Sequence, residues 1–220
     1  MLNVQCSILG ITGSIGSGKS HVCHLLEERG IPVFYTDVEA KAEMRENPDI
    51  HRELTALIGP EAIDADGHPV KAVLADYICR GPHYADQVNA IVHPRVRERM
   101  RKWLMVNGQW LMVNGDRSML NAQCSMLNGQ CSMVNACGIE SALLFESGFH
   151  TDCTATITVV APLELRIKRI MQRDHISREK ALEWINLQMP QEQKAALADH
   201  IIVNDSVTPI TPQIDKILNP

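Results

Sequence analysis

A glycine-rich stretch near the N-terminus constrains the fold of this chain more than any other feature. Gly13–Ser20 read G-x-x-x-x-G-K-S and follow the apolar run Ile8–Ile11. A helical pattern comes next, with Val22, Leu25 and Leu26 on one face. Glycines let successive backbone N–H groups turn inward around phosphate oxygens at the positive end of a helix. The order of strand, glycine-rich turn and helix therefore predicts a phosphate-binding loop, rather than a turn that binds nothing.

The polar residues of this loop have expected roles in nucleotide binding. Lys19 supplies a point charge to the β- and γ-phosphates of ATP, and the Ser20 hydroxyl can ligate Mg²⁺. A GTPase would add an Asn-Lys-x-Asp guanine reader, which the sequence lacks. A kinase needs instead a second substrate site, an acceptor-activating base and a cationic lid. The loop residues expected to bind ATP are Gly13, Ser14, Ile15, Gly16, Ser17, Gly18, Lys19 and Ser20.

Five short apolar strands separated by helical patterns predict an α/β fold with a parallel sheet covered on both faces. Between residues 38 and 104 the chain reads as helices, one of which is expected to end at His93-Pro94 and to be followed by another. The predicted strands are Val4–Ile11, Pro32–Tyr35, a strand that begins within Cys137–Leu144 and ends at or near Glu140, Thr156–Val160 and His200–Asn204.

Composition excludes several classes of protein. Hydrophobic residues make up 45% of the 220 residues and charged residues 21%, which argues against intrinsic disorder. The net charge of −5 argues against nucleic-acid binding, because phosphate contacts need a surplus of Lys and Arg. The 7 cysteines form no CxxC pair and we recognise no signal peptide, so we expect reduced thiols and a cytoplasmic protein. The uncharged stretch 118–139 is too rich in Asn, Gln and Ser to cross a membrane.

One aspartate is the candidate for the base. Asp37 follows the second predicted strand, and the carboxyl ends of parallel strands lie at the ligand-binding edge of a sheet, beside the phosphate loop. Its carboxylate could accept a hydroxyl proton as the γ-phosphoryl group transfers. Asp37 could also cap the helix that starts near Val38, and the two roles are compatible.

Basic residues in the last third of the chain predict a lid over the phosphates. Arg166, Arg169 and Arg173 are spaced to share one face of a helix predicted at 163–173. Convergent guanidinium groups neutralise the charge of a transferring phosphoryl group. The alternative is a solvated basic helix face. Further lid candidates are Lys168, Arg178 and Lys180.

Two glutamates and one histidine are also candidates for the site. Glu140 lies at or near the end of the third strand, where it could hold Mg²⁺ through water, and Glu146 is a second candidate. A plain surface or ion-pair role is the alternative for both glutamates. His93 could contact substrate, although a buried, hydrogen-bonded histidine is the more frequent case.

Residues 105–137 are anomalous because they repeat every seven residues. Units such as Met105–Gly108 and Met112–Gly115 recur in register, and Met1–Ser7 carry the same unit. Asn-Gly pairs form turns, and only about two positions per unit are strongly apolar, so we predict no coiled coil. The segment is either a surface excursion or a stretch that departs from the natural sequence. We favour the second, because long structureless loops are uncommon in compact domains, and we expect no chemistry here in either case.

Motifs from Ile8 to about Trp103, and from Gly138 to the last residues of the sequence, resemble those of the dephospho-CoA kinase family. The resemblance implies a P-loop kinase core at 1–37 and 138–220, with a five-stranded parallel sheet, an inserted helical substrate lobe at 38–104 and a small helical lid at about 166–190. It implies transfer of the ATP γ-phosphoryl group, with Mg²⁺, to the ribose 3′-hydroxyl of dephospho-CoA. The similar motifs are Ile11–Ser20, Gly30–Val33 with Asp37, Asn89–Pro94, Leu143–Glu146, Arg169 with Arg173, Asp174 and Gln188, and Ala198–Asn204.

The resemblance also assigns roles by position. It implies that Asp37, Lys19 and Arg173 are catalytic, and that Ser20 holds Mg²⁺ directly and Glu140 holds it through water. Two other P-loop functions stay open: a kinase of another small metabolite or nucleoside, and a non-catalytic nucleotide-binding switch. Residues implied at ATP outside the loop are Arg169 and Asn204, and those at dephospho-CoA are Asp37, Lys41, His93 and Phe145. Departures from the family pattern are Tyr35 for an aspartate, His21 for a threonine and Trp184 for an arginine.

Overall fold

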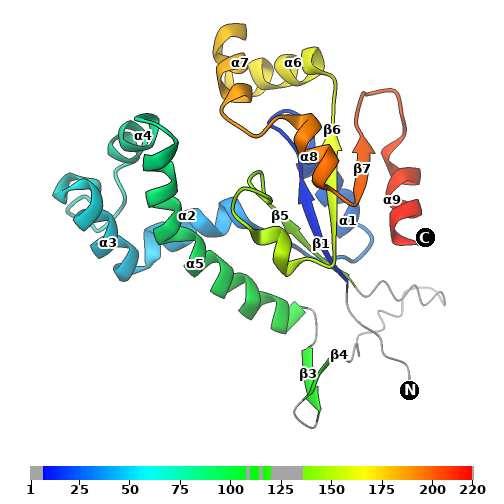
Figure 1. The fold of residues 1–220 in the computed structure, drawn as a ribbon, viewed down its shortest axis with the longest axis horizontal. Coiled ribbons are helices and arrows are strands. Elements are labelled where there is room, and N and C mark those ends of the chain that lie inside the picture. Colours follow the sequence, from blue (N-terminus) through cyan, green and yellow to red (C-terminus); the bar gives the residue numbers. More distant parts are fainter. Residues whose placement is uncertain (1–6, 108–109, 114–115, 120–135, 220) are drawn as a thin grey trace. The chain divides into compact units, whose positions relative to one another are not determined.

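The computed structural model describes residues 7–107, 110–113, 116–119 and 136–219 (Figure 1). The chain divides into two compact units. The first unit is built from the described residues of 1–34 and 103–220, and the second from residues 35–102. The phosphate loop and the sheet belong to the first unit, and Asp37 belongs to the second.

A five-stranded sheet forms the centre of the first unit, in the order β2-β5-β1-β6-β7. Strand β1 pairs in parallel with β5 on one side and β6 on the other, and β6 pairs in parallel with β7. The parallel sheet predicted from the sequence is confirmed, although the start predicted near Val4 lies outside the described residues. The strands are β1 (Ser7–Thr12), β2 (Val33–Tyr35), β5 (Ala136–Glu140), β6 (Ala155–Val160) and β7 (His200–Val203).

Apolar residues make these segments strands and bury them. Ile11 on β1, Ile139 on β5 and Val159 on β6 are all 0% exposed. Helix α1 (Lys19–Glu27) buries Val22 and Leu26 completely, as the helical spacing predicts. Helix α9 (Ile210–Leu218) lies beside β7 and α1 (Figure 1). Burial of the β-branched strand residues from water is what holds this unit together.

Two helices after β6 form the predicted lid, and a third returns the chain to the sheet. Helix α6 (Leu163–Asp174) and helix α7 (Arg178–Asn186) pack together, and α8 (Gln191–Leu197) leads into β7 (Figure 1). The Ser177 side chain accepts a hydrogen bond from the Lys180 backbone, so the predicted cap of α7 is confirmed. Ile167, Ile170 and Ala181 form the lid core, and Trp184 packs against it. The tryptophan at this departure from the family pattern therefore has a packing role.

The second unit is helical, as the sequence predicts, and its described residues hold one isolated β-bridge, Ile63 with Pro69. Helix α5 does not end at Pro94, so that prediction is wrong. A proline inside a helix costs about 3 kcal/mol or more, but Val92, Val96 and Met100 are buried on both sides of it. The Arg95 guanidinium also donates to the Ile91 carbonyl, 2.8 Å away. The helices are α2 (Thr36–Glu46), α3 (Pro48–Ile58), the short η1 (Pro60–Ala62), α4 (Lys71–Cys79) and α5 (Pro82–Asn107).

Part of the repeated segment forms a hairpin-like pair of strands. Strand β3 (Trp110–Val113) pairs antiparallel with β4 (Asp116–Met119) in a sheet separate from the five-stranded one. These residues are strands and not a coiled coil, and the rest of the repeats up to residue 135 lies outside the described residues. Within the described part of the chain, every helix is too short or too polar to cross a bilayer.

Candidate active site

The phosphate loop has the left-handed backbone that its glycines allow. Gly16 has φ of +79° and Gly18 has φ of +93°, and α1 begins directly after Gly18. A Cβ atom on Gly18 would lie 2.1 Å from the Asn204 amide nitrogen. Position 18 therefore requires glycine for its conformation and for the space it leaves to Asn204. The loop is closed by a hydrogen bond of 3.0 Å from the Ser17 N–H to the Ser14 carbonyl.

Lys19 and Glu140 meet at the carboxyl edge of the sheet. The Lys19 Nζ lies 3.2 Å from Glu140 Oε1, and their side chains are 14% and 9% exposed. Lys19 is the first residue of α1 and Glu140 the last of β5, so two different elements supply this pair. Ser20 is exposed in the first turn of α1. The hydroxyl of Ser20 and the carboxylate of Glu140 supply the oxygen ligands that Mg²⁺ prefers.

Arg169 and Asn204 converge on the phosphate loop. The Arg169 guanidinium donates to the carbonyls of Gly16 and Ser17, at 3.2 and 3.3 Å, and to Asn204 Oδ1 at 3.1 Å. The Asn204 amide donates to the Ser17 carbonyl at 2.7 Å. The structure thus brings together two residues that the resemblance alone placed at ATP, one from α6 and one from the end of β7.

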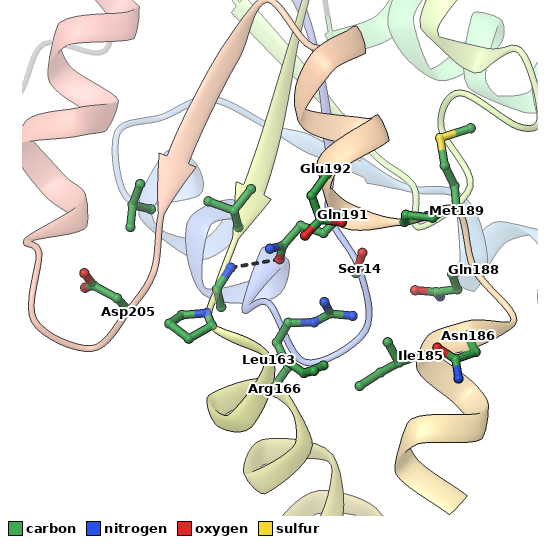
Figure 2. Close-up of a pocket in the computed structure, with 15 residues that line it drawn as sticks. Ser14, Leu163, Arg166, Ile185, Asn186, Gln188, Met189, Gln191, Glu192 and Asp205 are labelled. Atoms are coloured by element: carbon green, nitrogen blue, oxygen red, sulfur yellow. Dashed lines mark hydrogen bonds between the residues drawn. The ribbon is translucent and has the colours of Figure 1, made fainter.

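Arg166 and Gln188 reach the other side of the loop. The Arg166 Nε donates to the Ile15 carbonyl at 3.1 Å, and the Ile15 N–H donates to Gln188 Oε1 at 2.8 Å. Burial lowers the pKa of Arg166, and Glu192 opposes this shift. Arg166 and Gln188 line a cavity of about 670 Å³ together with Ser14, and Figure 2 shows the Arg166 side chain directed into it. The cavity lies between the phosphate loop, the lid and the start of α8.

The remaining lid cations have carboxylate partners of their own. Arg173 donates to both carboxylate oxygens of Asp174, at 3.0 and 2.7 Å, and its side chain is 61% exposed. Arg178 pairs with Glu164 and Lys180 with Glu183, and Lys168 is exposed. The three arginines predicted to share one helix face therefore differ: Arg166 and Arg169 contact the loop, and Arg173 contacts its neighbour.

The second unit holds the predicted base. Asp37 is exposed in the first turn of α2, while Tyr35 occupies the N-cap position, so the alternative that Asp37 caps this helix is wrong. An acidic residue in a first turn still interacts favourably with the helix dipole. Lys41 follows four residues later and shares a face of α2 with Asp37. Burial lowers the pKa of the half-buried His93 and Arg97 adds to this, while Asp37 raises it, so His93 and Asp37 lie close enough to interact.

A network of ion pairs that the sequence analysis missed positions α2. The Arg99 side chain on α5 pairs with Glu39, with Glu43 at 3.2 Å and with Glu46 at 3.7 Å, all three on α2. The spacing of Glu39 and Glu43 by four residues was the available signal, because such residues share a helix face. Their common partner is decided by the packing of α5 against α2.

The turn after β5 carries the last two candidates. The Phe145 ring lies 5.4 Å from the His150 ring. The Glu146 Oε1 lies 3.0 Å from the Nζ of Lys194, a residue that the sequence analysis did not select. Glu146 therefore has an ion-pair partner, as Glu140 has in Lys19, and its candidacy for Mg²⁺ stays a prediction. We find no sequence signal for Lys194, because its neighbours on α8 are an ordinary mixture of polar and apolar residues.

A parallel five-stranded sheet, a glycine loop at the start of α1 and lid arginines on that loop define the class of P-loop kinases. Comparison with protein families is more specific. The family model for dephospho-CoA kinase matches residues 7–114 and 119–209. This chain belongs to the dephospho-CoA kinase family. The matched ranges include the repeated segment except residues 115–118.

Individual relatives agree with the family model. A dephospho-CoA kinase of Bacteroides fragilis (strain YCH46) is 38% identical over 210 residues, which is 96% of this chain and 90% of the relative. A protein of Thermus thermophilus with a known crystal structure is 32% identical, with a TM-score of 0.72 over 97% of this chain and 95% of its own. The dephospho-CoA kinase of Campylobacter jejuni has a TM-score of 0.61 at 21% identity, over 96% of this chain and 94% of its own, and shows a shared fold.

Proposed function

We propose that this chain transfers the γ-phosphoryl group of ATP to the ribose 3′-hydroxyl of dephospho-CoA, giving CoA and ADP. The observation that carries this proposal is the convergence of Arg169 and Asn204 on a phosphate loop, in a chain that belongs to the dephospho-CoA kinase family. The other P-loop functions considered from the sequence, a different small-molecule kinase and a non-catalytic switch, have no such support from relatives.

The chemistry follows from the charges at the loop. As the acceptor oxygen bonds to the γ-phosphorus, the bond from that phosphorus to the β,γ-bridging oxygen breaks, and ADP leaves with the electron pair. Lys19, held by Glu140, is the cation for the β- and γ-phosphates. Arg169 and Asn204 bind the nucleotide beside the loop, and Arg173 supplies a further guanidinium to the transferring group.

The acceptor side of the reaction is assigned to the second unit and to Phe145. Asp37 takes the proton from the acceptor hydroxyl as the new bond forms, a role that its exposed carboxylate can perform. His93 lies close to Asp37, and Lys41 is one helical turn away, so both can contact the anionic acceptor. Ser20 and Glu140 are the residues that would hold Mg²⁺, with Glu140 acting through water as the resemblance implies. When bound, the ion would neutralise charge on the phosphates.

The direct test is an ATP-consumption assay with dephospho-CoA as acceptor. We expect stoichiometric ADP and a product with the mass of CoA, with the new phosphate on the 3′-oxygen by ³¹P NMR. Shikimate, gluconate and nucleosides serve as competing acceptors, and Lys19→Ala as the inactive control. Faster turnover of any of these acceptors would contradict the proposal, and so would ATP binding without phosphorylation of any acceptor.

A further inference from the structure

Lys194 is a buried charge that the proposed chemistry leaves without a role. Its side chain is 0% exposed, and it is the one lysine that is buried among the described residues. Burial of an ammonium group is costly unless the charge is paired and its hydrogen bonds are made. A lysine at this position therefore needs partners that keep it charged.

Those partners come from the turn after β5. The Lys194 Nζ donates a short hydrogen bond to the Ala142 carbonyl and lies 3.0 Å from Glu146 Oε1. Burial lowers the pKa of Lys194, with smaller contributions from the nearby cations Lys19 and Arg166, and the Glu146 carboxylate opposes the shift. Lys194 therefore lies close enough to Lys19 and Arg166 to feel their charges.

The contacts of Lys194 join three parts of the site. The Ala142 carbonyl also accepts a hydrogen bond of 3.5 Å from Thr12, the last residue of β1 before the phosphate loop. The Lys194 carbonyl accepts one of 3.2 Å from Thr158 on β6. Lys194 itself is on α8, the helix that follows the lid (Figure 1). The Lys194 side chain therefore connects the turn after β5 to α8, the helix that follows the lid.

The turn held in this way carries Phe145, which is assigned to the acceptor, and directly follows a residue that is assigned to Mg²⁺. It begins after Glu140, which pairs with Lys19, and it includes Phe145, which is assigned to the acceptor. Hydrogen bonds from Ser147 to the Leu143 carbonyl shape the turn, and bonds from the Ser141 N–H to the Ile11 carbonyl and from Thr12 to the Ala142 carbonyl join it to β1. The Lys194 contacts add a connection to α8.

We propose that the buried Lys194 and the partly exposed Glu146 form a positioning pair that fixes the turn after β5 and so orients the acceptor substrate toward the phosphate loop. The inference rests on the proposed function, since the acceptor is the one assigned there. Lys194 acts through the turn and not on a substrate atom. Misplacement of a reacting group by about 1 Å can cost on the order of 100-fold in rate.

The test uses the substitutions Lys194→Met and Glu146→Gln, singly and together, in the full-length enzyme. Met keeps the length and apolar stem of lysine without its charge, and Gln keeps the shape of glutamate. We expect each single variant to lower kcat/KM for dephospho-CoA by about tenfold or more, while the Kd for ATP without acceptor changes by less than about twofold. The kcat/KM of the double variant for dephospho-CoA should be within about threefold of that of the less active single variant, because the two residues act as a pair.

The matched control is Lys102→Met, which removes an exposed lysine paired with Glu98. We expect this variant to leave kcat/KM for dephospho-CoA and the Kd for ATP unchanged. If Lys194→Met does not fold, Glu146→Gln carries the test, because its side chain is 25% exposed and can be solvated. Unchanged kinetics in a folded variant would overturn the inference. A fall in stability with unchanged turnover per folded molecule would overturn it too, by showing a merely structural pair.

Two further results separate the positioning pair from an effect on ATP binding and from a failure of the proposed function. If the Kd for ATP rises by as large a factor as kcat/KM falls, Lys194 acts on the phosphate loop instead of the acceptor, and the inference is overturned. Failure of the wild-type enzyme to phosphorylate dephospho-CoA would overturn the proposed function and, with it, the acceptor role of the pair. Activity in the wild type with no loss in the variants would overturn the positioning pair alone.

Discussion

The phosphate loop shows how single residues determine the site. Gly18 is needed because its φ of +93° is left-handed and because Asn204 fills the space where a Cβ atom would lie. Lys19 is held by an ion pair with Glu140 at the end of a neighbouring strand. The side chain of Lys19 is therefore oriented by the fold, and the charge that it offers to a phosphate is already in position.

Replacing Lys19 by alanine should abolish most turnover. We expect kcat to fall by at least ~100-fold, in the range found when one electrostatic stabiliser of a transition state is lost. The measurement is steady-state phosphorylation of dephospho-CoA, with circular dichroism to show that the variant is folded. Near-normal turnover in a folded Lys19→Ala enzyme would contradict the role assigned to the phosphate loop.

Replacing Asp37 by asparagine separates proton transfer from helix stability. Asn keeps the shape but cannot take the proton, so we expect ATP binding to persist and kcat to fall by ~100-fold or more. The matched control is Asp49→Asn in the first turn of α3, where an exposed aspartate has the same place in its helix. Both variants should lose a similar ~0.3–1 kcal/mol of stability from the helix dipole, and only Asp37→Asn should lose turnover. Equal turnover in the two variants would show that Asp37 is not the base.

At the scale of elements, helix α6 presents two different arginine environments to the site. Arg166 and Arg169 donate to carbonyls of the phosphate loop, whereas Arg173 is bound to Asp174 at the end of the helix. The spacing along α6 predicts a shared face, but the loop reaches only its first two turns. Substitution of Arg166 or Arg169 should therefore affect a different kinetic constant from substitution of Arg173.

We expect Arg169→Ala to raise KM for ATP, because it removes contacts with Asn204 and with the loop backbone. Arg173→Ala should lower kcat by about tenfold or more with KM for ATP within about threefold, because the cation is needed most as charge shifts in the transition state. Gln172→Ala, at an exposed position of the same helix, is the control for effects on α6 itself. If Arg173→Ala changes only KM for dephospho-CoA, Arg173 does not belong to the ATP lid.

Helix α5 marks a limit of prediction at this scale. Pro94 predicts a helix end from local sterics, yet the helix continues, and residues before and after the proline are buried. The hydrogen bond that Pro94 cannot make is a local loss, while the burial of Val92, Val96 and Met100 from water is a gain that the local signal does not include. Tertiary packing therefore overrides the local signal.

At the scale of the whole molecule, the repeated segment stands apart from the five-stranded sheet. Strands β3 and β4 pair with each other, and among the described residues the large sheet contains neither of them. Met105 and Val106, at the end of α5, are 60% and 75% exposed. The segment thus begins at the surface.

Replacing residues 105–134 with a short polar linker should leave kcat/KM for dephospho-CoA within about threefold, because surface loops tolerate changes of length. Size-exclusion chromatography and circular dichroism show whether the shortened chain is folded. Loss of catalysis in a folded variant would show that the segment contributes to the site. Intact-mass measurement of protein from its natural source tests the hypothesis that this stretch departs from the natural sequence, and a mass that matches all 220 residues refutes it.

The sequence by itself determined the features that depend on neighbouring residues. The glycines of the loop, the β-branched runs of the strands and the Ser177 cap each follow from backbone freedom or side-chain spacing within a few positions. The alternation of strands and helices, and with it the parallel sheet, followed from these patterns. Glu140 was expected at the end of its strand for the same reason, and the structure has it there.

Only the tertiary structure decided which charged and polar groups meet. Glu140 with Lys19, Glu146 with Lys194 and Arg169 with Asn204 are pairs whose members lie on different elements and far apart in the chain. The sequence gives a residue its charge, but its partner and its burial depend on how strands and helices pack. The 0% exposure of Lys194 arises from that packing, because the turn after β5 and strand β6 both contact this one position of α8.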